Sequence, residues 1–323
     1  MAEAIISLEN LTKQYDETTA VDHLNLEIER GEVFGLLGPN GAGKSTTILM
    51  MLGLTEPTSG DVSVCGIDST RKPIEVKKRV GYLPDDVGFY EDLSGLDNLI
   101  YTAQLNRIPK REAQERANSL LERVGLAESG SKKAGKYSRG MRQRLGLADV
   151  LIKNPEVIIL DEPTLGIDPE GVREFLDLIQ RLSRDEGITV LLSSHHLHQV
   201  QQVCDRVGLF VHGRLLAKGD VHTLANQLFA DRPIVITVKA PNLSDGCIEK
   251  LNQIDEVIKI TQEGEALSIE AGRDITAEIA KTVIETEGTL EYVNKRDYGL
   301  DEIYHQYFEG GEARGNTRLH SES

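Results

Sequence analysis

The 323-residue sequence lacks the patterns that mark cysteine-based metal sites, disulfide frameworks and membrane-spanning helices. Its three cysteines, Cys65, Cys204 and Cys247, are far apart and form no CxxC pair, which excludes a cysteine zinc site and fits a reducing compartment. No apolar run approaches the roughly 18 residues that a membrane helix needs. The first residues also lack the basic flank and apolar core of a secretory signal. We therefore expect any role at a membrane to come through a partner.

Positive charge is scarce as well. The sequence has 36 lysines and arginines against 52 acidic residues, a formal net charge of −16. This balance argues against general binding to nucleic acid or to an anionic lipid surface, and its simplest meaning is solubility. The length is sufficient for one large domain and a small one.

Residues 1–225 alternate short apolar runs with helical patterns, which predicts an α/β domain. Four runs are apolar on both faces, as strands are when helices cover both sides of a mostly parallel sheet. They lie at residues 33–37, 157–160, 189–193 and 207–211. The segments at residues 5–8 and 24–28 are candidates for an antiparallel edge. Helical periodicity dominates residues 85–150, which we interpret as a helical lobe.

The pattern changes after residue 230, and we predict a small α+β domain at residues 231–309. Its apolar segments alternate in the order strand-helix-strand-strand-helix-strand, which matches a ferredoxin-like unit. The expected strands are residues 234–238, 257–260, 266–269 and 290–293, and the expected helices are residues 248–251, 275–284 and 300–308. Residues 310–323 are small, polar and charged, so we predict a disordered tail.

A glycine-rich segment follows the expected strand at residues 33–37 and precedes an apolar helix. It fits the phosphate-binding pattern G-x-x-x-x-G-K-[ST], in which backbone N–H groups surround phosphate oxygens. Lys44 is predicted to reach the β- and γ-phosphates, and the Ser45 hydroxyl to bind Mg²⁺. The predicted nucleotide-binding residues are Gly38, Pro39, Asn40, Gly41, Ala42, Gly43, Lys44, Ser45 and Thr46.

Two other strand ends carry polar side chains. Asp161 and Glu162 follow the buried run at residues 157–160. Asp161 is predicted to hold Mg²⁺ and Glu162 to act as base for the attacking water. His195 follows the run at residues 189–193, where a histidine can hydrogen-bond both phosphate and water. His196 offers no supported metal site and is interpreted, like His198, as part of a solvated helix face.

A second phosphate-binding helix start is predicted at residues 137–144, Tyr-Ser-Arg-Gly-Met-Arg-Gln-Arg. Ser138 and Gly140 lie where a helix would begin, and apolar residues follow at helical spacing. The free N–H groups of a helix start attract phosphate. One triphosphate already has the glycine-rich loop, so we infer that this second element serves a nucleotide held by another copy or a partner.

Along the chain the four motifs follow the order phosphate loop at residues 38–46, residues 137–144, Asp161–Glu162 and His195. In this order they resemble the ATP-binding subunit of ABC transporters, over residues 1 to 225. The resemblance implies a P-loop NTPase core with a mixed sheet and a helical lobe. Two copies would form a head-to-tail sandwich around two ATP and Mg²⁺, so we expect a homodimer.

The family's residue roles carry over to matching positions. Tyr15 is similar to the aromatic residue that stacks on adenine, although an ordinary core tyrosine is the alternative. Ser138 and Gly140 resemble the signature residues that contact the partner's γ-phosphate. Residues 165–168, ending in Asp168, resemble the loop that crosses to the other subunit. By the same resemblance His195 is the switch histidine and Glu162 the catalytic base.

Two departures from the family pattern narrow the resemblance. The signature, usually Leu-Ser-Gly-Gly-Gln, has Arg139 and Met141 at its third and fifth positions. Asp85 stands where a glutamine usually faces Mg²⁺ and the water; it can approach hydrated Mg²⁺ but cannot donate a hydrogen bond as an amide can.

Together with the added domain, these departures resemble the ABC-2 type subgroup, whose ATPase is a separate chain that drives a membrane permease. Residues 85–90 resemble the surface that receives the permease, where Phe89 and Tyr90 are either exposed anchors or local core. The resemblance implies an exporter subunit on the cytoplasmic face of the cell membrane. Drug, antibiotic, sodium and copper-enzyme maturation systems share these stretches, so the cargo stays open.

Two other classes remain as alternatives. Soluble ABC ATPases that act on DNA or ribosomes carry paired ATPase units, coiled coils or basic extensions, none of which is seen here. We therefore expect no nucleic acid partner. A regulatory ATPase would use residues 231–309 to sense a ligand, and ligand-dependent activity without a membrane partner would favour it.

Overall fold

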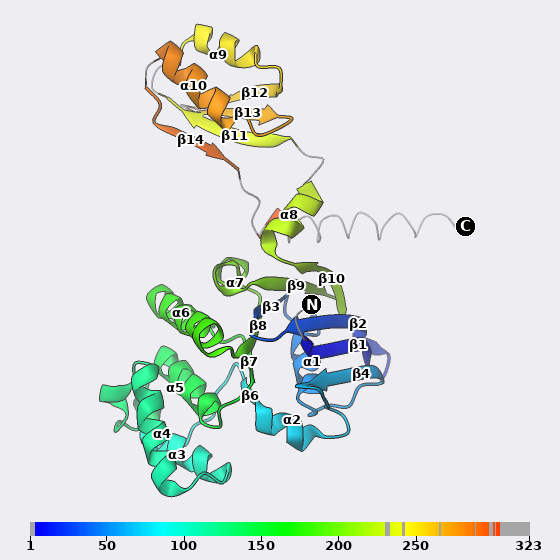
Figure 1. Cartoon of the computed structure of the whole chain (residues 1–323), viewed down its shortest axis with the longest axis vertical. Coiled ribbons are helices and arrows are strands. Elements are labelled where there is room, and N and C mark those ends of the chain that lie inside the picture. The colour runs from blue at the N-terminus through cyan, green and yellow to red at the C-terminus, as the bar shows by residue number, and fades with distance from the viewer. Residues whose placement is uncertain are drawn as a thin grey trace, which may run out of the picture. The chain divides into compact units, whose positions relative to one another are not determined.

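The computed structural model describes residues 4–229, 233–240, 243–264, 266–287, 289–296, 300 and 302–303. The described chain divides into two compact units, one running to Leu224 and the other from Ala225 to Ile303 (Figure 1). The expected helix at residues 300–308 falls largely outside the described residues, and the expected tail at residues 310–323 does so entirely. Within the described part, no helix is long and apolar enough to cross a membrane.

A six-stranded sheet forms the centre of the first unit, in the order β10-β9-β3-β8-β7-β6. Strands β9, β3, β8, β7 and β6 are parallel, and only β10 pairs antiparallel. The mostly parallel sheet predicted from the apolar runs is therefore confirmed, as is the mixed sheet that the resemblance implied. The strands are β3 (Val33–Leu37), β6 (Val80–Leu83), β7 (Val157–Asp161), β8 (Thr189–Ser194), β9 (Arg206–Val211) and β10 (Arg214–Gly219).

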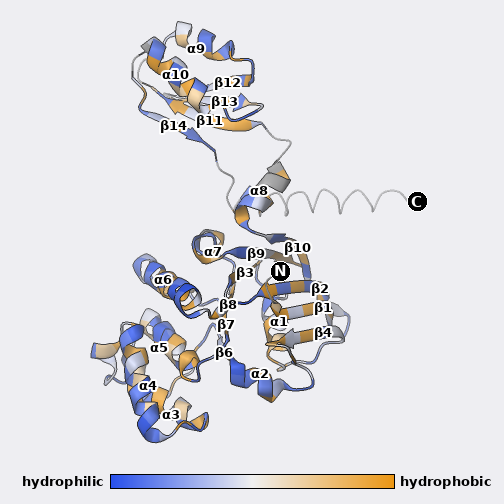
Figure 2. Ribbon diagram, in the orientation of Figure 1, coloured by the Kyte–Doolittle hydropathy of each residue, from blue (hydrophilic) through white to orange (hydrophobic). Residues whose placement is uncertain are grey.

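Strands β3, β7 and β8 are buried along their whole length, which explains why their sequences are apolar on both faces. Because they run parallel, their carboxyl ends meet at one edge of the sheet. The expected phosphate loop, the Asp161–Glu162 pair and His195 all follow these strands. Hydrophobic colouring gathers on the central strands and hydrophilic colouring covers much of α6 (Pro169–Glu186) (Figure 2).

The first strands form a separate antiparallel sheet, in the order β2-β1-β4-β5. The expected antiparallel pairing is confirmed, but these strands do not form an edge of the central sheet. Strand β1 instead pairs with β4, a strand distant in the sequence, and Ile6 of β1 lies opposite Val64 of β4. The helix α1 (Lys44–Met51) shares a hydrophobic core with both sheets. The strands are β1 (Ala4–Tyr15), β2 (Thr18–Glu29), β4 (Ser59–Val64) and β5 (Ile67–Asp68).

Three helices form the helical lobe, α3 (Gly95–Leu105), α4 (Lys110–Arg123) and α5 (Arg139–Leu151), and the short α2 (Pro73–Arg79) precedes β6 (Figure 1). Ser94 caps α3, since its Oγ accepts a hydrogen bond from the Asp97 N–H at 3.0 Å. Two 3-10 turns, η1 (Ala127–Ser129) and η2 (Ala134–Lys136), lead from α4 to α5. After β8 comes the short helix α7 (Leu197–Val203).

The second unit has the strand and helix order expected of a ferredoxin-like fold. All neighbouring strands pair antiparallel, in the order β12-β13-β11-β14. The last strand begins two residues later than predicted. After α8 (Val221–Phe229), the elements are β11 (Ile234–Lys239), α9 (Asp245–Asn252), β12 (Val257–Glu263), β13 (Ala266–Ala271), α10 (Thr276–Glu287) and β14 (Tyr292–Lys295).

Candidate nucleotide-binding site

The glycine-rich loop joins β3 to α1, as the sequence predicts. Gly43 has φ +104°, and a Cβ there would lie 2.2 Å from the carbonyl oxygen of Ala20, so only glycine fits. Gly41 has φ +80° and faces open space. Lys44 is 6% exposed, and its Nζ donates hydrogen bonds to the carbonyl oxygens of Gly38 (2.7 Å) and Pro39 (3.2 Å). The loop therefore presents bare backbone with a buried ammonium group at its centre.

The carboxylates at the end of β7 lie in two different environments. Asp161 is 6% exposed and accepts a hydrogen bond from the Ser193 hydroxyl on β8. Glu162 has φ +48°, a conformation that non-glycine residues seldom adopt, and its N–H donates to the Ser193 carbonyl. Its Oε1 accepts no hydrogen bond from the described residues and lies 3.5 Å from Lys44 Nζ. The strained backbone thus directs an under-bonded carboxylate toward the lysine.

His195 lies beside Glu162, as expected of two neighbouring strand ends. Its Nδ1 is 2.9 Å from Glu162 Oε2. The ring centroids of His195 and His196 are 4.0 Å apart. Burial is the main cause of the lowered pKa of His196, and the interaction with His195 lowers it further. Among the described residues there is no group of three or more histidines, cysteines or acids that could hold a metal.

The loop and the two carboxylates line one cleft of about 430 Å³. Of the residues that the sequence predicted, the lining includes Asn40, Gly41, Ala42, Gly43, Lys44, Ser45, Thr46, Asp85, Asp161 and Glu162. Ala20 and Tyr82 also line the cleft and were not predicted. Burial raises the pKa of Tyr82 to about 12, and the charges of Asp161 and Asp85 contribute. The sequence feature that could have predicted Tyr82 as a cleft residue is its position three residues before Asp85.

Tyr15 lies at the end of β1 and is 46% exposed, so it is not an ordinary core tyrosine. The Lys13 Nζ lies 4.8 Å from its ring centroid. Tyr15 pairs with Thr18, two residues before the cleft residue Ala20. An exposed aromatic ring of this kind can stack on a planar group.

Seven predicted residues do not line this cleft: Tyr15, Gly38, Pro39, His195, Ser138, Gly140 and Asp168. Ser138 caps α5, where its Oγ accepts from the Met141 N–H at 3.2 Å, which confirms the predicted helix start. Asp168 caps α6 in the same way through the Gly171 N–H. A Cβ at Gly140 would lie 3.4 Å from Ile167 Cγ2, so residues 138–140 and 165–168 pack together. We call this combined surface the signature edge.

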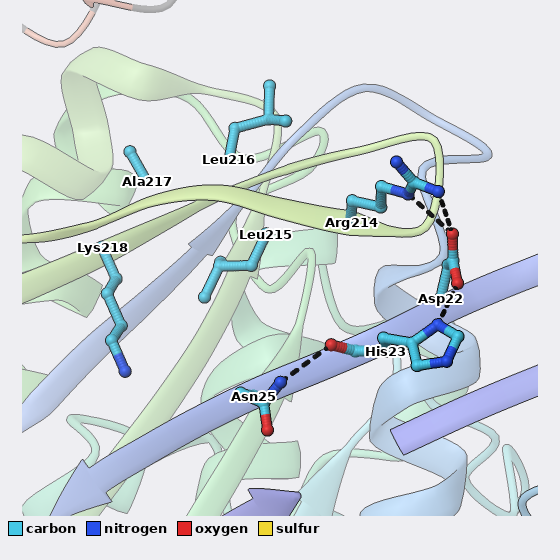
Figure 3. Close-up of a pocket in the computed structure, with 8 residues that line it drawn as sticks. All are labelled: Asp22, His23, Asn25, Arg214, Leu215, Leu216, Ala217 and Lys218. Atoms are coloured by element: carbon cyan, nitrogen blue, oxygen red, sulfur yellow. Dashed lines mark hydrogen bonds and ion pairs between the residues drawn. The ribbon is translucent and has the colours of Figure 1, made fainter. Parts of the chain in front are cut away.

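A larger cleft, about 590 Å³, lies between β2 and β10 and holds none of the predicted residues. Asp22 accepts hydrogen bonds from Arg214 and contacts His23 Nδ1 at 2.6 Å (Figure 3). The hydrogen bonds from His23 and Arg214 lower the pKa of Asp22. The Asp22–Arg214 pair joins β2 of the first sheet to β10 of the central sheet.

Known proteins resemble this chain in sequence. The ABC transporter family profile matches residues 21–165. The chain is 33% identical over 293 residues to the linearmycin resistance ATP-binding protein LnrL of Bacillus subtilis, covering 90% of this chain and 92% of that protein. It is 43% identical over 212 residues to the bacitracin transport ATP-binding protein BcrA of Bacillus licheniformis, covering 66% of this chain and 68% of that protein.

Solved structures agree with the sequence relatives. The ATP-binding protein cbiO1 of Clostridium perfringens, part of the transporter complex cbiONQ, superimposes with a TM-score of 0.64 at 30% identity, covering 71% of this chain and 92% of that one. The cassette MJ0796, solved as a dimer bound to ADP and Pi, has a TM-score of 0.61 at 25% identity, covering 67% of this chain and 98% of that one. The chain belongs to the ABC transporter family, as an ATP-binding and ATP-hydrolysing subunit of the ABC-2 type.

Proposed function

We propose that this chain is the ATPase of an exporter, that it works as a homodimer, and that it drives a separate membrane permease from the cytoplasmic face. One observation carries the proposal: three parallel strand ends bring Lys44, Glu162 and His195 into contact beside a phosphate loop. The names of the relatives, which include bacitracin transport and daunorubicin resistance proteins, support export as the direction.

The cleft residues fit a magnesium nucleotide. Gly41 leaves open space over the loop, and Lys44 and the glycine-rich backbone provide the positive charge that phosphates need. Mg²⁺ prefers a few oxygen ligands and keeps several waters. The Ser45 hydroxyl and Asp161 carboxylate, both on the cleft wall, are the residues that would hold it, with Asp85 as a further candidate. When bound, Mg²⁺ neutralises charge that develops on the phosphates.

Hydrolysis follows from the pairing of Glu162 with its neighbours. Its Oε1 is buried and accepts no hydrogen bond from the described residues, and we assign it the proton of the attacking water. Nδ1 of His195 lies 2.9 Å from Oε2 and so orients the carboxylate. The proton of the attacking water passes to Glu162, and the Lys44 ammonium stabilises the negative charge on the γ-phosphate.

A tyrosine pair marks the proposed permease surface. Tyr90 is 57% exposed and meets Tyr101 of α3 edge to ring, with centroids 5.1 Å apart. The buried amide of Asn98 bonds both the N–H and the carbonyl of Tyr90, which fixes this backbone. Phe89 is half-buried, so of the two expected anchors Tyr90 is the one presented to a partner.

The test is Glu162→Gln in the full-length chain. We expect ATP binding to persist, ATP-dependent dimers to accumulate in light scattering, and phosphate release to fall by about 100-fold or more, since a positioned base contributes 10²–10⁴. Glu115→Gln, the same chemical change on the exposed surface of α4, is the matched control and keeps the wild-type rate. A Glu162→Gln chain that hydrolyses ATP normally would sink the assignment. Isolation of the wild-type chain from membranes should also recover the permease.

A further inference from the structure

The signature segment carries three arginines, and two of them are occupied. Arg144 pairs with Glu174. Arg142 lies 3.7 Å from Glu91 and donates to the Gly135 carbonyl. Arg139 is exposed, and its guanidinium has no ion pair or hydrogen bond with the described residues. This arginine stands where glycine is usual, so it adds a cation that the usual signature does not have.

The side chain of Arg139 has a defined direction. A Cβ built at Gly166 would lie 2.8 Å from Arg139 Cδ and 2.9 Å from Nε. The arginine therefore runs across the 165–168 loop, on the same surface as Ser138 and Gly140. Its guanidinium lies against Gly166 on the signature edge, and it does not line the phosphate-loop cleft of its own chain.

We propose that Arg139 binds the γ-phosphate of the ATP held by the other subunit of the dimer and stabilises the charge that develops there during hydrolysis. The proposal rests on the head-to-tail dimer proposed above. A guanidinium can meet two phosphate oxygens at once, which glycine cannot do. In the reaction water attacks the γ-phosphorus, the bond to the bridging β–γ oxygen breaks, and the water proton passes to Glu162. Arg139 neither gains nor loses a proton.

The competing arrangement lies within one chain. Arg139 and Asp85 line a common cavity of about 250 Å³, and Asp85 also lines the ATP cleft. If Arg139 acted through Asp85, its effect would fall on the site of its own subunit. The two arrangements therefore differ in which of the two ATP sites loses activity when Arg139 is removed.

Single substitutions measure the size of the effect. Arg139→Ala should lower kcat by about tenfold or more, because one removed donor to a developing charge typically costs 10²–10³ when fully buried. ATP affinity of the isolated subunit should stay at the wild-type value. Arg139→Lys should retain part of the kcat that Arg139→Ala loses, since lysine keeps the positive charge but lacks the planar guanidinium that bonds two oxygens. Arg111→Ala, which removes an exposed cation of α4, should change nothing.

Mixed dimers then assign the effect to a subunit. A limiting amount of Arg139→Ala chain is mixed with excess Glu162→Gln chain, so that each active subunit meets an intact partner signature. Action across the dimer predicts the same rate as limiting wild-type chain with the same excess. Action within one chain predicts the full Arg139→Ala defect. The reciprocal mixture, limiting wild type with excess Glu162→Gln/Arg139→Ala chain, should show the defect only if Arg139 acts across the dimer.

The outcomes separate the two proposals. Wild-type chain that neither hydrolyses ATP nor dimerises would overturn the proposed function. A normal Arg139→Ala rate, or a defect that stays with its own subunit, would overturn only the role of Arg139. If the mixture of wild type and Glu162→Gln shows no ATPase activity, a second measurement replaces the rates. It compares the dissociation constant of the ATP-dependent Glu162→Gln dimer with that of the Glu162→Gln/Arg139→Ala dimer. If Arg139 acts across the dimer, the double variant must dimerise more weakly than Glu162→Gln. Added salt must also weaken the dimer of the double variant less than it weakens the Glu162→Gln dimer.

Discussion

The sheet edge and the helical lobe of the ATPase unit present their functional residues in opposite ways. At the sheet edge Lys44 and Asp161 are each 6% exposed and already bonded to neighbouring strands or loops. In the lobe Ser138, Arg139 and Tyr90 are exposed. The difference follows from position, because parallel strand ends are fixed by a buried sheet while the lobe's residues lie at helix starts and in loops.

This contrast indicates a division of labour. In the proposed function, the sheet edge of one chain binds phosphate and orients a water. The lobe offers two surfaces, the signature edge and the Tyr90 surface, whose exposed residues need something outside the chain. Changes at the sheet edge should therefore damage binding and chemistry, and changes in the lobe should damage what depends on a partner.

The largest effect is expected at the sheet edge from Lys44→Ala. Removing the only ammonium group in the phosphate loop, and the hydrogen bonds that hold the loop closed, should weaken ATP binding by about 100-fold or more. Titration with a fluorescent ATP analogue measures this. Lys110→Ala on the lobe surface is the control. Normal affinity in the Lys44 variant would contradict the reading of the loop.

A smaller effect is expected in the lobe from Tyr90→Arg. Loss of an exposed aromatic anchor should lower recovery of the chain with permease-containing membranes by about tenfold, and ATP binding should be unchanged. Co-sedimentation measures the recovery. Tyr292→Arg, at an exposed tyrosine of the second unit, should behave as wild type. Equal recovery of both variants would remove Tyr90 from the docking surface.

The smallest effect concerns the stability of the lobe. Asp149 on α5 is partly buried, and burial raises its pKa to about 6, against opposing contributions from Thr102 and Lys153. Its Oδ1 has no hydrogen-bond partner among the described residues. Because the folded pKa lies above the unfolded value of about 3.9, the folded state binds more protons, and stability falls as pH rises from about 4 to 6.

Asp149→Asn should remove that pH dependence and raise the free energy of unfolding at pH 8 by about 1–2 kcal/mol, after allowance for partial exposure. Urea unfolding at pH 5 and pH 8 measures it. Asp177→Asn, on the exposed face of α6, is the control. A wild-type difference between the two pH values that survives in the Asp149 variant would show that another group causes it.

Local patterns predicted the sheet edge well and the first strands poorly. The buried strands β3, β7 and β8 are apolar on both faces, and each leads directly to a polar motif, so sequence alone identified them. The first two strands also appeared as strands, but their sheet was misassigned. Its order depends on the contact between Ile6 and Val64, which are separated by 58 positions in the chain. Local sequence patterns do not reveal such a pairing.

The second unit shows the same balance. Its alternation of strands and helices predicted the ferredoxin-like order, because each element carries its own hydrophobic period. The start of the last strand was placed too early, since Leu290 packs on the core before the ladder with β11 begins. Burial and strand pairing begin at different residues there, and an apolar pattern reports only burial.

What could be learned from the sequence was the chemistry of each segment. A glycine-rich loop before Lys44, acids after a buried strand and a serine before an amphipathic helix each have a physical meaning that depends on near neighbours. Tertiary structure alone set which of these groups meet. It placed Glu162 between Lys44 and His195, brought Tyr82 to the cleft wall, and left Arg139 exposed across Gly166. Such contacts join residues far apart in the chain, and their geometry follows from how strands pair and helices pack.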